Sequence, residues 1–461
     1  MLWNFPTQLL LAASVGLAAP ANAEAPKATT AAAPSGTVKT TGSALGVELT
    51  VESFTLDNGL RVHVVEDHSV PAFAMHTAFE VGSQDEEDGR SGFAHLFEHM
   101  MFKGSENVPD GGYFKNVLGV GGVMNAFTSA DVTQYFAVLP SHYLDMILWL
   151  ESDRLRSLVI TDENFENQRS AVKEERAMRY ENQPYAQALA LFRTSLWEGS
   201  GYGHTTIGSQ ADLTAAGTAD VQAFFDKYYV PNNAVITIVG DVEVAEVKAK
   251  IEKFYGDIPK GEARTDRKNV DHTQKAVVKR TEDPHARQPL YVVGWKTVPY
   301  DHPDRPALEL LMSMLLRGES ARITKVLTDD KKMVVAALPM GTAGGRNAGS
   351  EMAGFIPLPG NSFGDIQAVV KEEVEKVKKK GVSSRDLTKA KNRATVDTVG
   401  ALATNNGRAF QIVQGALFHD DPLFVLRDLE LTQAVTAKDI KRVANTYLGD
   451  DWFTLEIVPK P

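Results

Sequence analysis

The 461-residue chain has no cysteine. This absence excludes disulfide bonds and thiol catalysis, but it does not place the protein in a compartment, because many exported bacterial proteins also avoid thiols. Long apolar runs are missing as well. The longest run, from Leu9 to Ala19, is shorter than the roughly 18 to 20 residues that a membrane-spanning helix requires. We therefore predict no stable membrane span.

Positive charge is also scarce. The formal net charge is −11 and the isoelectric point is about 5.6, and the sequence has no strong block of Lys and Arg. A general nucleic-acid binder is thereby excluded, because phosphate binding needs clustered positive charge. A G-x-S-x-G nucleophile elbow is missing too, which disfavours a serine hydrolase. A hydrophobic content of 43% and a charged content of 23% are typical of a globular protein.

The N-terminus has the pattern of an export signal. An apolar core at 9–19 is followed by the small residues Ala21-Asn22-Ala23, a suitable cleavage site, although no Lys or Arg precedes the core. We expect residues 1–23 to be a signal peptide and the protein to be exported, to the periplasm. Residues 24–46 are rich in Ala, Thr, Ser, Pro and Gly without apolar periodicity, which predicts a flexible tether.

The rest of the chain alternates predicted strands and helices in two successive sets, 47–258 and 285–461. The polar stretch within 259–284 is predicted to link them. Strands Val51–Leu56 and Leu60–Glu66 flank an Asn-Gly turn in the first set, and a helix is predicted over Arg305–Leu316 in the second. The predicted fold class is α+β: two similar domains from an internal duplication, each a mainly antiparallel sheet with helices packed on one face.

The duplication is also visible in a gapless alignment of one helix from each half. Phe93–Gly104 lies over Ala307–Gly318 at an offset of 307 − 93 = 214, and both segments end at Gly after a basic residue. The second half keeps the apolar helix but not the polar residues of the first. His95, Glu98 and His99 fall opposite Glu309, Met312 and Ser313. The second domain is therefore predicted to lack the ligand set of the first.

The strongest chemical signal is the motif His95-Leu96-Phe97-Glu98-His99. Residues four apart share a helix face, so the two imidazoles can converge on one metal. Glu98 lies near the same face, where its carboxylate can take a proton from water. Two His and one carboxylate leave an open coordination position, which fits Zn²⁺ best. Histidines one turn apart also occur by chance on surface helices, but this helix is otherwise apolar, and a metal would compensate the desolvation of its polar groups.

A third ligand is predicted on the helix Glu163–Tyr180, which carries Glu166, Glu174 and Glu175. Any of these three acids can serve, because composition does not distinguish them. Adjacent helical residues point about 100° apart, so Glu174 and Glu175 cannot both face one metal equally well. The alternative interpretation of such acids is a solvated helix face.

These motifs and several longer stretches resemble the pitrilysin/insulinase family of zinc peptidases, in the branch of short two-domain subunits similar to mitochondrial processing peptidase. The resemblance covers nearly all of residues 50–459, and its stretches are FTLDNGLRVHVVED, SGFAHLFEHMMFKGS, GGVMNAFTSADVTQYF, AVKEE, GYGHTTIG and YYVPNNAVITIVGDV. It implies that 47–258 is a metal-bearing peptidase domain. In the family a glutamate about 76 residues after the second His completes the site, and 175 − 99 = 76 selects Glu175. A family acid seven positions earlier is replaced here by Gln168.

The resemblance also implies a peptide-binding edge strand at Met124–Thr128, where Asn125 and Ala126 would contact an extended substrate through the main chain. On residue type alone, Asn125 is almost as well explained as a turn residue. Complete enzymes of the family carry an Arg and a Tyr seven residues apart in the second domain. Thr328 and Val335 occupy these positions here. The resemblance therefore implies a homologous partner subunit that supplies the Arg/Tyr pair.

Two classes of function remain after these observations. The first is a zinc-dependent endopeptidase, the catalytic subunit of a heterodimer. The second is a noncatalytic assembly or peptide-binding subunit of the same fold. Relatives that serve as scaffolds typically lose the H-x-x-E-H set, so the intact set and a correctly spaced Glu175 favour the enzyme.

Overall fold

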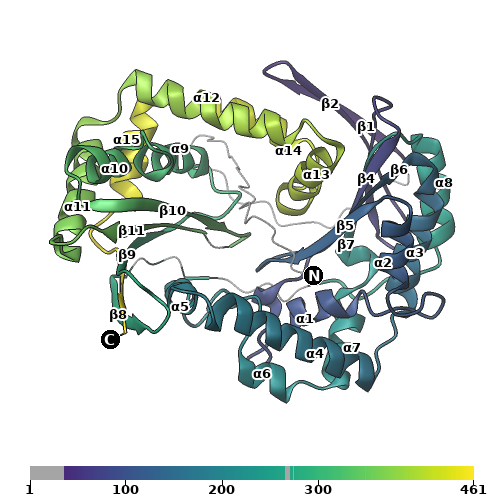
Figure 1. Ribbon diagram of the computed structural model, residues 1–461. Coiled ribbons are helices and arrows are strands. Elements are labelled where there is room, and N and C mark those ends of the chain that lie inside the picture. The colour runs from purple at the N-terminus through teal and green to yellow at the C-terminus, as the bar shows by residue number, and fades with distance from the viewer. Residues whose placement is uncertain (1–35, 265–269, 272, 274, 348, 461) are drawn as a thin grey trace.

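The computed structural model describes residues 36–460 except 265–269, 272, 274 and 348. The predicted signal peptide and the first part of the predicted tether lie outside the described residues. Two β-sheets lie on opposite sides of the molecule, each with its own set of helices (Figure 1). The prediction of an α+β protein with two similar domains is confirmed.

The first sheet has seven strands and ends at β5, beside the predicted metal helix. Its hairpin β2–β3 turns at Asn58-Gly59 as expected, where the Gly59 N–H donates to the Leu56 carbonyl at 2.8 Å. Across the sheet the strand order is β1 (Val38–Ala44), β2 (Val47–Thr55), β3 (Arg61–Glu66), β7 (Ala234–Gly240), β4 (Ala72–Phe79), β6 (Thr133–Pro140) and β5 (Val123–Thr128).

The second sheet repeats five strands of the first in the same order. Both sheets contain a single parallel pair, β3–β7 in the first and β8–β12 in the second, and every other pair is antiparallel. The same strand order and the same strand directions in both sheets agree with the predicted internal duplication. The strands, in the order that corresponds to β3-β7-β4-β6-β5, are β8 (Val277–Asp283), β12 (Phe453–Pro459), β9 (Leu290–Thr297), β11 (Gly349–Pro357) and β10 (Val334–Gly344).

Helices from the same half cover one face of each sheet and bury a large apolar core. Phe73 and Met75 of β4 pack in the first core, and Val293 and Trp295 of β9 pack in the second. The first set of helices is α1 (Phe93–Met100), α2 (Gly112–Gly119), α3 (Leu144–Ser157), α4 (Asp162–Arg176), α6 (Gln210–Ala215), α7 (Thr218–Tyr228) and α8 (Val244–Tyr255). The second set is α9 (Arg305–Leu316), α10 (Arg322–Lys325), α11 (Phe363–Lys380) and α15 (Ala437–Tyr447).

Helices of the same half pack on one face of each sheet, as predicted, and each half also sends one helix to the opposite face of the other half's sheet. Helix α5 (Ala186–Leu196), from the first half, buries Phe192 against Val292 and Leu455 of the second sheet. Helix α13 (Asn405–His419), from the second half, buries Ile412 against the far face of the first sheet. The apolar faces of α5 and α13 predicted that both helices would be buried, but they did not specify against which sheet.

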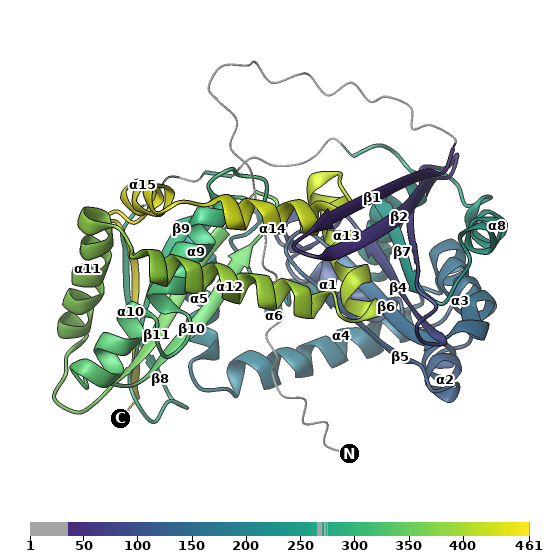
Figure 2. The same ribbon diagram turned by 90° about the horizontal axis from the view of Figure 1, so that it is seen from above.

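The exchanged helices are reached by long connections that run between the domains. Helix α12 (Ser384–Ala401) leads from the second domain to α13, and α14 (Phe424–Ala434) packs against β1 (Figure 2). On the other side, a π-helical turn over Ala177–Glu181 joins α4 to α5. The predicted helix over Glu163–Tyr180 is therefore a regular α-helix only as far as Arg176.

Two predicted connecting segments contain strands instead. The flexible tether expected over 24–46 is wrong at its second half, because Val38–Ala44 forms the edge strand β1, paired in register with β2. The linker expected over 259–284 includes β8, which pairs with β12. β1 (VKTTGSA) and β8 (VVKRTED) are mostly polar in sequence, so neither has the apolar alternation or the continuous apolar run that predicts a strand. Among the described helices, none has the length and apolar character needed to cross a membrane.

Candidate metal centre

The residue before helix α1 is a glycine, and the surrounding backbone requires it. Gly92 has φ +94°, and a Cβ there would lie 2.6 Å from the carbonyl oxygen of Ile207. The buried carboxylate of Glu86 accepts the backbone N–H groups of Gly92 and Ala94, both at 2.8 Å. Burial raises the pKa of Glu86, and these two hydrogen bonds oppose the rise. The first turn of the metal helix is therefore fixed by an acid that precedes it in sequence.

Three predicted ligands meet where α1 packs against α4. Nε2 of His95 lies 3.7 Å from Oε1 of Glu175, and Nε2 of His99 lies 3.2 Å from Oε2 of the same carboxylate. The centroids of the two imidazole rings are 4.8 Å apart, and the rings are arranged edge to face. One ligand atom from each of the three side chains lies within 4.8 Å of the others.

The spacing of these atoms fits a tetrahedral zinc ion. Ligands about 2.1 Å from zinc in tetrahedral directions are themselves about 3.4 Å apart. The two His–Glu separations, 3.7 and 3.2 Å, lie on either side of this value. The set of two imidazoles and one carboxylate is also the donor set of hydrolytic zinc sites that keep a position open for water. The residues present therefore fit zinc.

Burial and neighbouring charges shift the pKa values of the three ligands. Burial lowers the pKa of His95 to about 4, which keeps this ring neutral and able to bind a metal. Burial also opposes the charged form of His99, but the hydrogen bond and the charge of Glu175 raise its pKa. For Glu175, burial is outweighed by the hydrogen bond with His99 and by nearby positive charges, so its pKa is lowered. Arg179, one turn later on the same helical segment, pairs with Glu175 at 2.9 Å.

Glu98 lies beside the cluster and is held by a residue of the edge strand. It is only 9% exposed, and its Oε2 accepts the hydroxyl of Thr128 at 2.5 Å. Burial raises the pKa of Glu98, and the hydrogen bond from Thr128 opposes the rise. A carboxylate with a raised pKa, fixed next to a metal site, suits general-base chemistry.

The other acids considered for the metal face elsewhere. Glu166 is exposed and pairs with Arg169, and Glu174 is exposed to solvent. Gln168 occupies the place of the family acid and forms a hydrogen bond that raises the pKa of His99. A neutral amide therefore supports one ligand where the resemblance led us to expect a carboxylate.

The predicted substrate strand is an edge strand. Among the described strands β5 pairs only with β6, and Asn125 is exposed on it. The backbone N–H of Ala126 donates to the side-chain oxygen of its neighbour Asn125 at 2.9 Å. A peptide that added to this edge would compete with the Asn125 side chain for that N–H.

Two family models match the chain. "Insulinase (Peptidase family M16)" matches residues 61–209, which include all the residues of the cluster, and "Peptidase M16 inactive domain" matches residues 217–394. The chain belongs to peptidase family M16. The match of the second model to a stretch that contains α9 agrees with the absence of the H-x-x-E-H set from that helix.

Relatives in the M16 family cover most of the chain. It is 29% identical to "Zinc protease PqqE" of Helicobacter pylori, over 87% of this chain and 90% of that protein. It is 23% identical to "Probable mitochondrial-processing peptidase subunit beta, mitochondrial" of Arabidopsis thaliana, over 86% and 76% of the two chains. A crystal structure of a protease from Helicobacter pylori superposes with a TM-score of 0.84 and 26% identity, over 89% of this chain and all of that one. The predicted family and its short two-domain branch are confirmed, and these similarities support a peptidase that uses zinc.

The M16 positions of the Arg/Tyr pair are occupied by side chains with local roles. The Thr328 hydroxyl donates to the Thr324 carbonyl at 2.9 Å, and Val335 is an exposed residue at the start of β10. Two nearby cations are also paired locally. Lys325 binds Asp330 at 3.0 Å, and Arg322 lies 3.7 Å from Asp386.

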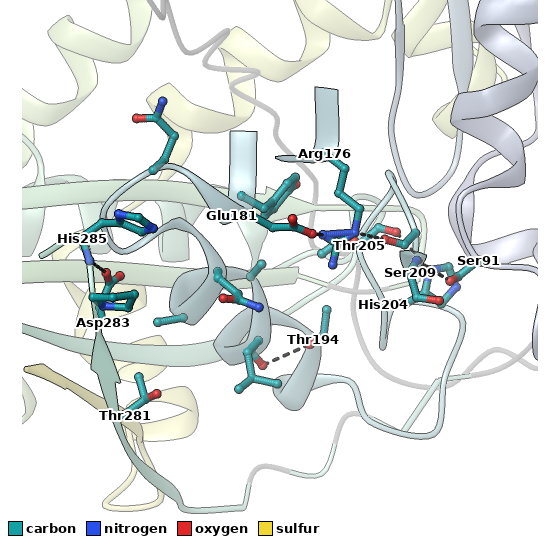
Figure 3. Close-up of a pocket in the computed structure, with 18 of the residues that line it drawn as sticks. Ser91, Arg176, Glu181, Thr194, His204, Thr205, Ser209, Thr281, Asp283 and His285 are labelled. Atoms are coloured by element: carbon teal, nitrogen blue, oxygen red, sulfur yellow. Dashed lines mark hydrogen bonds and ion pairs between the residues drawn. The ribbon is translucent and has the colours of Figure 1, made fainter. Parts of the chain in front are cut away.

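A cavity of about 570 Å³ lies beyond the C-terminal end of α4 in this M16 chain (Figure 3). It is lined by the end of α4, the start of α5, the loop around His204 and the end of β8. Arg176 crosses it to bind Glu181 at 2.9 Å and the Gly208 carbonyl at 3.1 Å. None of the three metal-cluster residues is among the described residues that line it.

Sequence reasoning missed three residues that contact the cluster or its helix. Arg179 follows Glu175 at the i, i+4 spacing of a helical ion pair, so its contact could have been anticipated. Thr128 and Glu86 approach α1 from other elements, and nothing in their local sequence indicates it.

Proposed function

We propose that this chain is a zinc-dependent endopeptidase that cleaves extended or unfolded peptides. The observation that carries the proposal is one arrangement: His95, His99 and Glu175 converge, and Glu98 is held by Thr128 next to the edge strand β5. The three converging residues would hold the zinc. Bound zinc lowers the pKa of a water molecule to about 7 and polarises a carbonyl oxygen.

The chain's own residues perform the remaining steps. The edge of β5 binds the peptide backbone in an extended form, which aligns the scissile bond with the cluster. The Glu98 carboxylate accepts the proton of the attacking water and then delivers it to the leaving amine. The Thr128 hydroxyl keeps that carboxylate turned toward the cluster. A substrate must therefore be locally unfolded, and a compact folded domain should resist cleavage.

Metal analysis combined with turnover tests the site. Wild-type protein should hold one zinc per chain. His99→Ala and Glu175→Gln should lose it, whereas Glu98→Gln should keep the zinc and lose turnover. Glu174→Gln is the matched control, because that acid is exposed on the same helix, and it should keep both zinc and turnover. Full zinc occupancy in His99→Ala would refute the ligand assignment.

We also propose that the chain is the catalytic subunit of a heterodimer whose homologous partner supplies the Arg and Tyr missing at 328 and 335. Attack on the peptide carbonyl places negative charge on its oxygen, and one well-placed donor can contribute roughly 3 to 4 kcal/mol to catalysis. The local pairing of Thr328, Lys325 and Arg322 supports a donor from outside the chain. Mixing with the partner should then raise turnover far above the sum of the separate rates. Full activity of the pure chain would contradict this.

The second candidate function is a noncatalytic assembly or peptide-binding subunit. It is favoured by the missing Arg/Tyr pair, and it predicts zinc binding without turnover even when the partner is present. The export pattern at 1–23 supports a periplasmic location for either function. Mass determination of the N-terminus of protein purified from the periplasmic fraction tests it, with cleavage after Ala23 as the expected result.

A further inference from the structure

The turn between β10 and β11 of the second domain contacts the first domain. At its tip, the Arg346 backbone N–H donates to Oδ2 of Asp131 at 3.0 Å. The hydroxyl of Tyr202, in the loop after α5, donates to Oδ1 of the same carboxylate at 2.6 Å and accepts the Asn347 N–H at 3.2 Å. We call Asp131, Tyr202 and the tip 345–347 the Asp131 junction. It joins both domains at a single buried carboxylate.

The junction is tightly fitted. A Cβ built on Gly345 would lie 2.4 Å from Oδ2 of Asp131 and 2.9 Å from a ring carbon of Tyr202, so the tip approaches as closely as glycine permits. The Arg346 guanidinium adds two contacts to other elements. It donates to Oε2 of Glu80 at 3.1 Å and to the carbonyl of Leu417 at 2.8 Å.

Asp131 depends on the donors that surround it. It is 4% exposed, and burial raises its pKa to about 6, while the hydrogen bonds from Tyr202 and the Arg346 N–H oppose the rise. A buried carboxylate that loses a donor keeps its desolvation penalty without compensation. The position of Asp131 is therefore tied to the tip of the second domain.

Asp131 lies in the turn that closes the hairpin of β5 and β6. Thr128 pairs with Thr133 at the end of this hairpin, and the Ser129 N–H donates to the Val132 carbonyl at 2.8 Å. The Asp131 N–H in turn donates to the Ser129 hydroxyl at 3.3 Å. A hydrogen-bonded turn therefore connects the junction to Thr128, the residue that holds Glu98.

We propose that the second domain positions the catalytic carboxylate of the first through the Asp131 junction, which fixes the β5–β6 turn, Thr128 and thereby Glu98. This inference rests on the proposed function, in which Glu98 is the general base. Asp131 and Tyr202 are positioning residues, because they reach the cluster only through Thr128. The second domain thus has a role in catalysis although its α9 carries no ligand set.

Tyr202→Phe in the zinc-loaded full chain, assayed with its partner, tests the inference. This variant keeps the ring and removes the donor to Asp131. We expect kcat to fall about threefold to tenfold, the value of one hydrogen bond, with one zinc per chain retained. Tyr185→Phe is the matched control, because its hydroxyl also joins the two halves, through the Gln288 carbonyl at 2.8 Å, and Gln288 belongs neither to the Asp131 junction nor to the β5–β6 turn. Tyr185→Phe should leave kcat unchanged.

A double-mutant cycle with Thr128→Val distinguishes positioning from general loosening. If the junction acts through Thr128, adding Tyr202→Phe to Thr128→Val should lower kcat no further. Fully multiplicative effects of the two substitutions would overturn the inference. So would an unchanged kcat in Tyr202→Phe.

Amide hydrogen exchange provides a readout that does not require turnover. In Tyr202→Phe, exchange should accelerate across 123–133 and stay unchanged in α1, whereas Tyr185→Phe should leave 123–133 unaffected. If the wild-type chain binds zinc but shows no turnover with any partner, the proposed function fails, and exchange alone then decides whether the junction fixes the turn. Equal exchange of 123–133 in wild type and Tyr202→Phe overturns the inference in either case.

Discussion

The exchange of helices between the domains predicts that they unfold together. Phe192 of α5 belongs to the first half in sequence, yet it is fully buried in the core of the second sheet. The centroid of its ring lies 6.4 Å from the centroid of the Phe453 ring. A ring carbon of Phe192 also lies 3.6 Å from the place that a Cβ would take if Gly294 had one. Replacing Phe192 with Ala should therefore remove support from the second domain although the substitution lies in the first.

The cost follows from complete burial. Phe→Ala in a close-packed core destabilises by about 3 to 5 kcal/mol, because it loses the transfer free energy of the ring and leaves a cavity. Leu191, one residue earlier on the same helix, is 54% exposed. Leu191→Ala is the matched control and should change the free energy of unfolding by no more than about 0.5 kcal/mol.

Denaturant unfolding followed by amide exchange and mass spectrometry resolves the two domains. In Phe192→Ala, peptides from α9 and from α1 should lose protection at the same, lower denaturant concentration, because the π-helical turn over Ala177–Glu181 links α5 to α4, which packs against α1. Loss of protection in α9 alone, with α1 unchanged, would show that the exchanged helices do not couple the domains. A cost below about 1 kcal/mol would refute the packing argument itself.

Three further predictions concern single residues. Glu86→Ala should raise the dissociation constant for zinc roughly tenfold in a chelator competition, because two N–H groups at the start of α1 lose their acceptor, and an unchanged constant would contradict this. Burial lowers the pKa of His76 to about 4 from its ordinary 6.5, so the unfolded chain is protonated first as the pH falls. On lowering the pH from 7 to 5, this residue should lower the free energy of unfolding by about 2 kcal/mol. His76→Gln should remove this pH-dependent loss. Arg154→Met should destabilise by about 3 to 5 kcal/mol in denaturant unfolding, because it leaves the buried carboxylate of Glu151 without its cation, and a cost near zero would show that Glu151 finds another partner.

Much of the local structure follows from the sequence. The helix predicted over Arg305–Leu316 has these bounds in the structure, and the strands on both sides of Asn58-Gly59 form the expected hairpin. Both features rest on signals that span only a few residues: apolar periodicity in the helix and turn chemistry in the hairpin. β1 and β8 lacked such signals. They are strands because a neighbouring strand offers its hydrogen bonds, which no short window of sequence reveals.

The same division holds for the metal cluster. The sequence by itself determined that His95, Glu98 and His99 lie close together, since helix geometry alone places residues three and four apart on one face. The family spacing pointed to Glu175, but only the tertiary structure brought this carboxylate to the imidazoles and Thr128 to Glu98, because these contacts depend on how α4 and β5 pack against α1. The sheet that receives each amphipathic helix was decided in the same way. An apolar face requires burial, but it carries no information about which of two similar sheets will cover it.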